Sequence, residues 1–541
     1  MLKFIKRHIN SVKRDGTEAI IRKAKKLPAF LNAIYIQRFS SLWLWSSVRK
    51  LTELFGLKWS LPYFREVNMI YSRSFSKFVK NGDLKAVDLT ADHMSSLIHK
   101  GLVYQPNNYE YYYFLAGIKL FVGQVDEWAK YTKIAFQKRE KLLNQVLPKD
   151  LGLRLFSTRC VGGIGLACHW DAMLKARYLG LIPPDKLVMI WSREKSTANR
   201  HWMNYLGEYV NFLDMNKNEH KKVISLFRGI ERDAGECFHE PFRIGNHVYV
   251  YTHSALALIE HHWDRENREP LFKLTPEDID YGRHQLSRLG VPKDAWFVCL
   301  HVREGGFNGN EFFRQAPIQD YLMAIQAVVD KGGWVIRMGD PTMTPLPQMD
   351  NVIDYPHCAI YSDRMDIIIC GLCRFFIATS SGLYTVAKAF GKPIVQTNYL
   401  PTCTIYFSKQ DVFLPKLAKR VKNNTLLKFS EIMSAPFSFG VHDINYKQMG
   451  VDLINNTPDE IMEIVEEMID KLDGKFKVDA TDEDLQTKFK DMTAKVGTLY
   501  GLDNVTINCR IGTHFLRRYQ YLLSPCERNL ENRQRSFVSA N

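Results

Sequence analysis

Short apolar runs that end in glycine- or serine-containing turns recur along residues 296–400. Three of them are Trp296–Arg303, Gly333–Met338 and Phe375–Ala378, and helical runs such as Ile318–Asp330 join them. Buried strands of a parallel sheet read as continuous apolar runs, and their alternation with helices is typical of βαβ units. The pattern therefore predicts an α/β fold with a doubly wound parallel sheet, whose turns meet along one edge.

The turn Thr379–Gly382 lies between the third apolar run and a helical run that ends at Gly391. Backbone N–H groups at the start of a helix favour a bound anion, so this turn is a candidate for holding a diphosphate. An ordinary capped helix in an α/β core is the alternative.

A similar pattern covers residues 151–290. Apolar runs at Leu153–Phe156 and Leu187–Ile190 predict strands, and a glycine-rich turn between them opens a helix. The turn contains Gly162, Gly163 and Gly165, which would let a substrate approach the backbone closely. Its spacing differs from G-x-G-x-x-G, so the turn alone does not predict a dinucleotide site.

Most of the excess charge lies near the N-terminus. The formal net charge is +15, and residues 1–50 carry twelve Lys or Arg against two acidic residues. Because Trp43 and Trp45 lie beside this charge, residues 1–60 are predicted to be a basic amphipathic segment on an anionic membrane surface. A basic helix that packs on the body or on a partner subunit is the alternative. The rest of the chain is close to neutral, which argues against nucleic-acid binding.

The remaining chain divides by composition. Residues 61–150 are rich in helix formers, and Pro106–Ala129 resembles one tetratricopeptide-like helical pair, which suggests a docked subdomain or a surface for a protein partner. Scattered cysteines and the lack of an apolar run long enough to span a bilayer favour a cytoplasmic protein, peripheral on the inner face of the membrane. The predicted domains are 1–60, 61–150, 151–290, 291–523 with a C-terminal helix that crosses to the first α/β domain, and a loose tail, 524–541.

Four stretches carry a family resemblance. They are His301–Phe307, Arg337–Pro341, Asn351–Tyr355 and Thr379–Gly382, the last followed by Gly391–Pro393. Together they resemble the donor-binding domain of GT-B glycosyltransferases, specifically those of bacterial surface-polysaccharide gene clusters. The His-Val-Arg turn at 301–303 also resembles one in GT-B fucosyltransferases, in which the arginine meets the nucleotide diphosphate. The resemblance implies two Rossmann-type domains, a nucleotide-sugar donor, a glycan or lipid-linked acceptor and no further cofactor.

The resemblance also implies a site. The expected donor or diphosphate residues are Arg303, Gly305, Arg337, Gly339, Asp340, Thr379, Ser380, Ser381 and Gly382, with Gly162, Gly163 and Gly165 as the acceptor-side loop. A general base would remove the acceptor proton. His169, Asp171 and Glu304 are the candidates for catalytic residues, and the choice among them stays open.

We expect no metal at this site. The D-x-D matches at 278–280 and 482–484 lie in helical contexts and are interpreted as solvated faces, and the histidines between 239 and 262 lack a standard ligand spacing. Arginines and a helix N-terminus would then neutralise the leaving diphosphate. A pyruvyl transferase, a sugar-nucleotide epimerase and a non-catalytic polysaccharide-assembly protein are the alternative functions.

Deleting residues 1–50 is expected to release the protein from anionic vesicles, because that segment holds the clustered positive charge and both tryptophans of the proposed anchor. Vesicle co-sedimentation of the full and shortened chains measures this. Binding that survives both the deletion and high salt would contradict the prediction.

Overall fold

The computed structural model describes much of the chain beyond residue 60. The described residues are 46, 49–50, 53, 61–75, 83–122, 124–146, 152–191, 197–227, 242–244, 247–249, 252–304, 312–400, 408–433, 437, 443–498 and 508–524. The predicted basic segment, 1–60, and the predicted tail, 524–541, lie almost entirely outside these residues. The chain divides into two units, Met1–Leu142 and Leu143–Asn541.

The described part of the first unit is mainly helical. Its helices are α4 (Leu61–Ile70), α6 (Leu84–Tyr104), α7 (Tyr109–Phe121) and α8 (Val125–Val146), with a π-helical turn, η2 (Tyr71–Phe75), after α4. The ring of Phe64 in α4 meets the rings of Tyr111 and Phe114 in α7 edge to face, an arrangement that aromatic rings prefer. The likeness of these helices to tetratricopeptide repeats stays a prediction.

The second unit contains two parallel sheets. The smaller one has the order β1-β2-β3 and defines what we call the first lobe, residues 152–265. Its strands are β1 (Leu153–Phe156), β2 (Lys186–Trp191) and β3 (Val210–Asp214), its helices α9 (Ala167–Tyr178), α10 (Trp202–Leu206), α11 (Asn218–Phe227) and α13 (Thr252–Arg265), and its short turns η4 (Thr158–Val161) and η5 (Ile164–Leu166). A separate antiparallel pair is formed by β4 (Phe242–Ile244) and β5 (His247–Tyr249).

The larger sheet defines the second lobe, residues 276–524, and its strands run in the order β14-β11-β10-β9-β6-β7-β8, all parallel. They are β6 (Phe297–His301), β7 (Trp334–Arg337), β8 (Val352–Asp354), β9 (Phe376–Ala378), β10 (Ile394–Tyr399), β11 (Val412–Pro415) and β14 (Arg510–Ile511). Five of the seven have every residue buried or nearly so, as their apolar sequences predict. The predicted mixed α/β fold with a large parallel sheet is therefore present.

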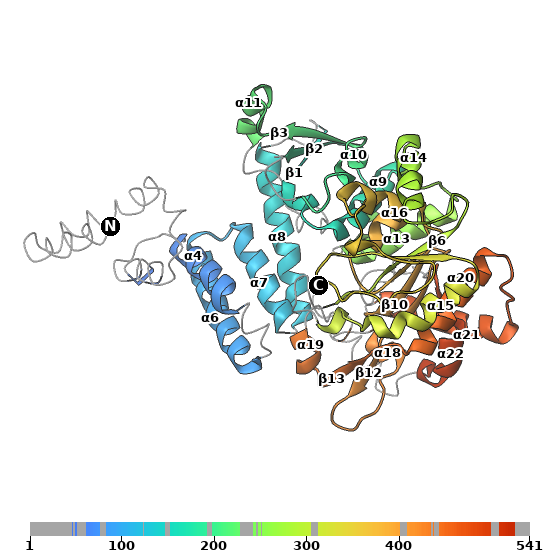
Figure 1. Ribbon diagram of the computed structural model, residues 1–541. Helices are drawn as coiled ribbons and strands as arrows, with labels where there is room; N and C mark the ends of the chain where they lie inside the picture. The colour runs from blue at the N-terminus through green and yellow to red at the C-terminus, as the bar shows by residue number, and fades with distance from the viewer. Residues whose placement is uncertain are drawn as a thin grey trace, which may run out of the picture. The chain divides into compact units, whose positions relative to one another are not determined.

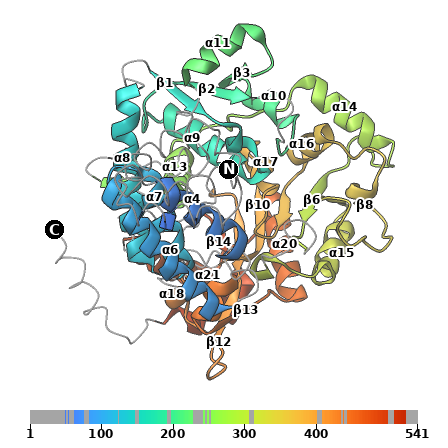
Figure 2. The ribbon, with the colours of Figure 1, turned by 90° about the vertical axis from the view of Figure 1, so that its left-hand side faces the viewer.

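Helices cover both faces of this sheet (Figure 1). One face carries α15 (Leu322–Asp330) and α20 (Pro458–Leu472), and the other carries α16 (Asp363–Leu372) and α17 (Tyr384–Ala389), with α14 (Pro276–Ser287) packed on α16. The remaining elements are β12 (Leu417–Arg420), β13 (Val451–Ile454), α18 (Phe429–Ile432), α19 (Asp443–Gln448), α21 (Ala480–Thr498), α22 (Thr513–Arg518), η6 (Phe312–Arg314), η7 (Ile318–Tyr321), η8 (Tyr355–His357) and η10 (Gln520–Leu523). Within the second unit, β1 to β3 and the pair β12 and β13 lie at opposite ends (Figure 2).

The segment between the lobes is itself packed. Phe272 is buried, with its ring centroid 4.8 Å from that of Trp202 and 5.2 Å from that of Tyr209, both in the first lobe. Phe390, at the end of α17 in the second lobe, lies 5.2 Å from Tyr205. One aromatic cluster therefore contains residues from both lobes and from the link between them.

The C-terminal segment differs from the prediction of one helix crossing to the first domain. Arg510 and Ile511 instead add strand β14 beside β11, and α22 packs against α20 and α21 of the second lobe. The backbone N–H of Thr513 donates to the buried Glu467 at 2.7 Å, which holds this segment at the edge of the second sheet. No helix among the described residues has the length and apolar character needed to cross a membrane.

Candidate functional site

The order of strands in the large sheet reverses between β6 and β9. From β6 the chain proceeds through β7 to β8 on one side, and from β9 it proceeds through β10 to β11 on the other. Ligands of doubly wound sheets bind outside the carboxyl ends of the strands at such a point, because the two following turns lead to opposite faces. The turn after β6 contains Arg303 and Glu304, and the turn after β9 is Thr379–Gly382, so the sequence-predicted residues of both turns meet here.

Hydrogen bonds fasten these two turns to each other. The backbone N–H of Arg303 donates to Thr379 Oγ1 at 2.9 Å, and the N–H of Thr379 donates to the carbonyl of His301 at 3.1 Å. Arg314 Nε donates to the carbonyl of Ser380 at 2.8 Å. Thr379 and Ser380 therefore shape the turns, whereas Arg314 is a further cation at this edge that no sequence pattern indicated.

Two buried polar atoms at the ends of β6 and β9 make no hydrogen bond among the described residues. Ser381 is 7% exposed and its Oγ makes no hydrogen bond there, and the same holds for Nδ1 of His301, which is 9% exposed. Burial, with help from Arg337 and Arg303, lowers the pKa of His301 to about 4, so its imidazole is neutral near pH 7. An unsatisfied buried polar group costs free energy unless something binds it, so both atoms are candidates for contact with a ligand at this edge.

The glycine-rich turn of the first lobe lies against the same place. A Cβ on Gly382 would lie 2.8 Å from the backbone nitrogen of Gly165, and one on Gly165 would lie 3.2 Å from the Cα of Gly382. Thr385 Oγ1 donates to the carbonyl of Ile164 at 3.3 Å. The predicted acceptor-side loop and the predicted diphosphate turn are therefore in backbone contact, at the carboxyl ends of β1 and β9.

A cavity of about 610 Å³ opens at this edge of the second lobe. Glu304, Thr344 and Lys416 line it from the segments that follow β6, β7 and β11. The buried Lys416 donates through Nζ to the carbonyl of Gln315 at 3.0 Å and to Asn455 Oδ1 at 2.6 Å. The volume of the cavity and the few polar groups that line it suit a small-molecule site.

Arg337 lies where β7 ends, yet it does not reach solvent. Its side chain is 0% exposed and pairs with Asp354 of β8 at 2.9 Å and with Glu304 at 3.7 Å. Glu304 also accepts from the N–H of Thr344 at 2.8 Å. Arg337 is thus placed to orient Glu304 rather than to touch a diphosphate directly, because its guanidinium is fully enclosed and pairs with two carboxylates.

The other predicted residues lie apart from the two turns or outside the described chain. Asp340 accepts from the N–H of Thr342 at 2.9 Å and so closes the turn after β7, in which Gly339 has a φ of 144° that favours glycine. Gly162 and Gly163 belong to the turn that leads to Gly165. Gly305 lies outside the described residues.

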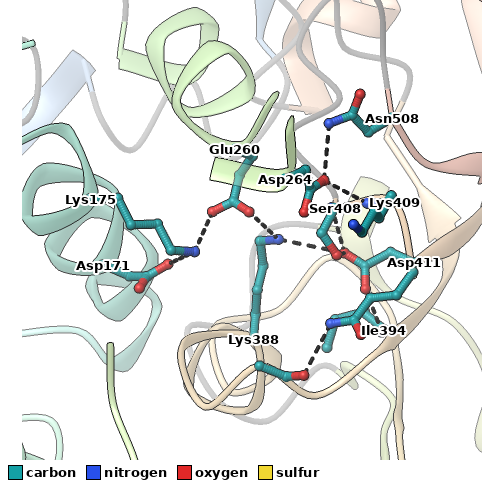
Figure 3. Close-up of polar contacts among 12 residues, drawn as sticks. Asp171, Lys175, Glu260, Asp264, Lys388, Ile394, Ser408, Lys409, Asp411 and Asn508 are labelled. Atoms are coloured by element: carbon teal, nitrogen blue, oxygen red, sulfur yellow. Dashed lines mark hydrogen bonds and ion pairs between the residues drawn. The ribbon is translucent and has the colours of Figure 1, made fainter. Parts of the chain in front are cut away.

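Of the two candidate bases in the first lobe, His169 is better placed. It is half-buried in the first turn of α9, directly after the glycine-rich turn. Asp171 is 2% exposed and pairs with Lys175 at 2.7 Å, within a buried chain of charges (Figure 3). Burial raises the pKa of Asp171 to about 6 although Lys175 lowers it. A carboxyl that is enclosed in this way has no described contact with the site, so the geometry does not support Asp171 as the base.

The acidic pairs interpreted as solvated faces are partly buried, which corrects that prediction. Asp278 is buried and accepts from His201 at 2.7 Å, Tyr205 at 2.5 Å and Arg364 at 2.8 Å, and Asp482 is buried against Arg517. Among the described residues, no group of three or more His, Cys, Asp or Glu side chains could hold a metal ion.

Comparison with known proteins gives structural neighbours only. No protein-family model and no curated protein matches the chain. Among solved structures, a family 9 glycosyl transferase from Veillonella parvula DSM 2008 is 13% identical, with 49% of this chain and 86% of that chain covered and a TM-score of 0.29. E. coli heptosyltransferase WaaC with ADP is 9% identical, with 48% and 90% covered and a TM-score of 0.28.

A third neighbour is the dodecameric iron-containing heptosyltransferase TibC, from enterotoxigenic E. coli, in complex with ADP-D-β-D-heptose. It is 11% identical, with 59% of this chain and 78% of that chain covered and a TM-score of 0.30. These neighbours are glycosyltransferases, but TM-scores this low do not establish a common overall arrangement. The assignment of function therefore rests on the residues of this chain.

Gly382→Ala is expected to destabilise the protein by about 1–3 kcal/mol, because the new methyl group would overlap the backbone of Gly165, which cannot move aside as a flexible side chain can. Denaturant unfolding measures the change. Gly163→Ala is the matched control in the facing turn, since a Cβ there meets no atom within 4 Å. Equal effects of the two substitutions would contradict the close contact.

Asp171→Asn is expected to change how stability depends on pH. With a raised pKa in the folded state, Asp171 favours folding fully below its unfolded value, about 3.9, and this contribution is lost as pH rises through about 6. The variant should therefore gain stability relative to the wild type between pH 4 and 6, and the gap should stay constant to pH 8. Unfolding measured across this range tests it, with the exposed Asp484→Asn as the control, and a gap of opposite slope would show a depressed pKa.

Proposed function

We propose that this protein is a glycosyltransferase of the GT-B type, which moves a sugar from a nucleotide-activated donor to a cell-surface glycan or lipid-linked acceptor without a divalent metal. The observation that carries the proposal is the contact of Gly165 with Gly382. It joins the carboxyl edges of two parallel sheets in separate lobes, which is the arrangement that a reaction between two substrates from opposite sides requires.

The donor would bind to the second lobe. Its diphosphate would lie at the turns after β6 and β9, where Arg303 supplies charge and Ser381 Oγ supplies an unsatisfied hydrogen-bonding atom. The neutral imidazole of His301 could accept or donate one hydrogen bond there without adding charge. The adjacent cavity lined by Lys416 and Asn455 would take the nucleoside.

The acceptor would approach past the glycine-rich turn of the first lobe. His169, in the first turn of the helix that follows, is the base that this arrangement favours, with Glu304 as the alternative on the donor side. Because α17 has only six residues, its dipole adds little, and the charge of the leaving diphosphate would fall mainly to arginine. Attachment of residues 1–50 to an anionic membrane would place the active site at the cytoplasmic face, where lipid-linked acceptors are found.

The full chain is expected to bind a nucleotide-diphosphate sugar and to transfer its sugar in the presence of a chelator. A ligand at 100 times its dissociation constant adds about 2.7 kcal/mol of stability, so a thermal-shift screen finds the donor and mass spectrometry of the product identifies the transfer.

Arg303→Ala should lower turnover roughly 10²–10³-fold with little change in folding, by analogy with the loss of one donor to a developing oxyanion.

Arg288→Ala is the matched control, because Arg288 is exposed at the end of α14 and bonds only to nearby residues of that helix in the described structure. Activity that a chelator abolishes and manganese restores would overturn the metal-free part of the proposal. Donor binding without transfer to any glycan would instead point to an enzyme of different outcome, and no binding at all would refute the proposal.

A further inference from the structure

Helix α13 contacts both lobes with different faces. Leu256 and Ile259 pack in one apolar cluster with Ala172 and Ala176 of α9, so α13 belongs to the first lobe. The neighbouring positions Glu260 and Asp264 bond to residues of the second lobe. One face of this helix thus packs within the first lobe, and another makes polar contacts with the second lobe.

Glu260 is the residue of α13 that bridges two lysines. Its carboxylate is 4% exposed and accepts from Lys175 of α9 at 2.7 Å and from Lys388 of α17 at 3.3 Å (Figure 3). Burial alone would raise the pKa of Glu260, but the two ammonium groups outweigh it and hold the pKa below its usual value. The bridging carboxylate is therefore ionised at neutral pH.

The two bridged helices are the ones that follow the facing turns. Helix α9 begins directly after η5, which contains Gly165, and α17 begins two residues after Gly382. Both helices also pack against each other. Because the Glu260 carboxylate bonds to both Lys175 and Lys388, it is placed to fix how the two turns meet at the candidate site.

Each lobe has an acid–lysine pair of its own in this cluster. Lys175 has its own acid, Asp171, at 2.7 Å on the same helix, and Lys388 has Asp411 at 3.5 Å in the second lobe. Without the charge of Glu260, each lobe would keep one neutral acid–lysine pair. Since breaking a buried ion pair is costly only when it leaves a charge uncompensated, neither lobe needs this carboxylate for its own interior.

We propose that Glu260 is a positioning residue, which holds the glycine-rich turn of the first lobe against the Ser-Ser-Gly turn of the second by bridging Lys175 and Lys388. The inference rests on the proposed function only in taking that junction as the place of sugar transfer. The structural part of the inference requires no ligand.

Other contacts of α13 keep the effect local. Asp264 accepts from the N–H of Lys409 at 2.8 Å and from Asn508 Nδ2 at 3.0 Å, and His261 Nδ1 lies 2.9 Å from Asn508 Oδ1. These bonds do not involve Glu260. We therefore expect the helix to stay docked on the second lobe when the bridge is removed.

The test is hydrogen exchange of the full-length Glu260→Gln variant, followed by mass spectrometry of peptides from each turn. Amides of residues 162–167 and 380–386 are expected to exchange at least about tenfold faster, since a hydrogen bond to a charged group contributes enough to shift a local opening equilibrium by that factor. Amides of β6 and β10 should exchange as in the wild type. Glu266→Gln, near the end of α13 and exposed, is the matched control and should change neither set.

Every other outcome overturns the inference. Equal acceleration at all amides would mean that Glu260 only stabilises the fold, and no acceleration at the turns would mean that the bridge does not position them. Failure of the variant to fold would contradict the expectation that each lobe keeps a compensated acid–lysine pair without the charge of Glu260. Because exchange is measured without donor, the inference can succeed while the search for a nucleotide sugar fails, and the reverse also holds.

Discussion

The reversal of strand order between β6 and β9 is the constraint on which the rest of the second lobe depends. Right-handed crossovers place α15 on one face of the sheet and α16 with α17 on the other, so the turns after β6 and β9 lead away from each other. The opening between them cannot be closed by regular secondary structure. Arg303, Ser381 and His301 all lie at this opening, and the hydrogen bond from Arg303 to Thr379 keeps the two turns at a fixed distance.

Two sets of buried ion pairs hold the segments at this edge in place. Arg337 and Asp354 join β7 to β8 inside the lobe and leave Glu304 oriented at the surface of the cavity. Farther from the sheet, Glu260 joins the lobes. Such pairs add little net stability compared with apolar packing, but separating them leaves a buried charge uncompensated, so they hold the segments that they join in one arrangement.

Much of the α/β architecture could be predicted because buried parallel strands are continuous apolar runs. The first strand was predicted at Leu153–Phe156, as observed. The turn at Thr379–Gly382 was predicted from its position after an apolar run, which forms β9. Arg337 was predicted to bind the diphosphate, and its burial against Asp354 was missed because that partner comes from another strand, which no local pattern reveals. The buried state of Asp278 and the bridge at Glu260 depend on distant residues in the same way. The two-residue strand β14 is too short for any periodicity.

The position of Phe272 in a cluster shared by both lobes has a consequence for biosynthesis. Trp202 and Tyr205 of the first lobe leave the ribosome long before Phe390, which completes their aromatic contacts. Until α17 is made, the first lobe presents aromatic side chains that lack Phe390, and Glu260 lacks its second lysine, Lys388. The first lobe is thus expected to complete its packing only after α17 is made, so we expect the two lobes to fold together rather than in turn.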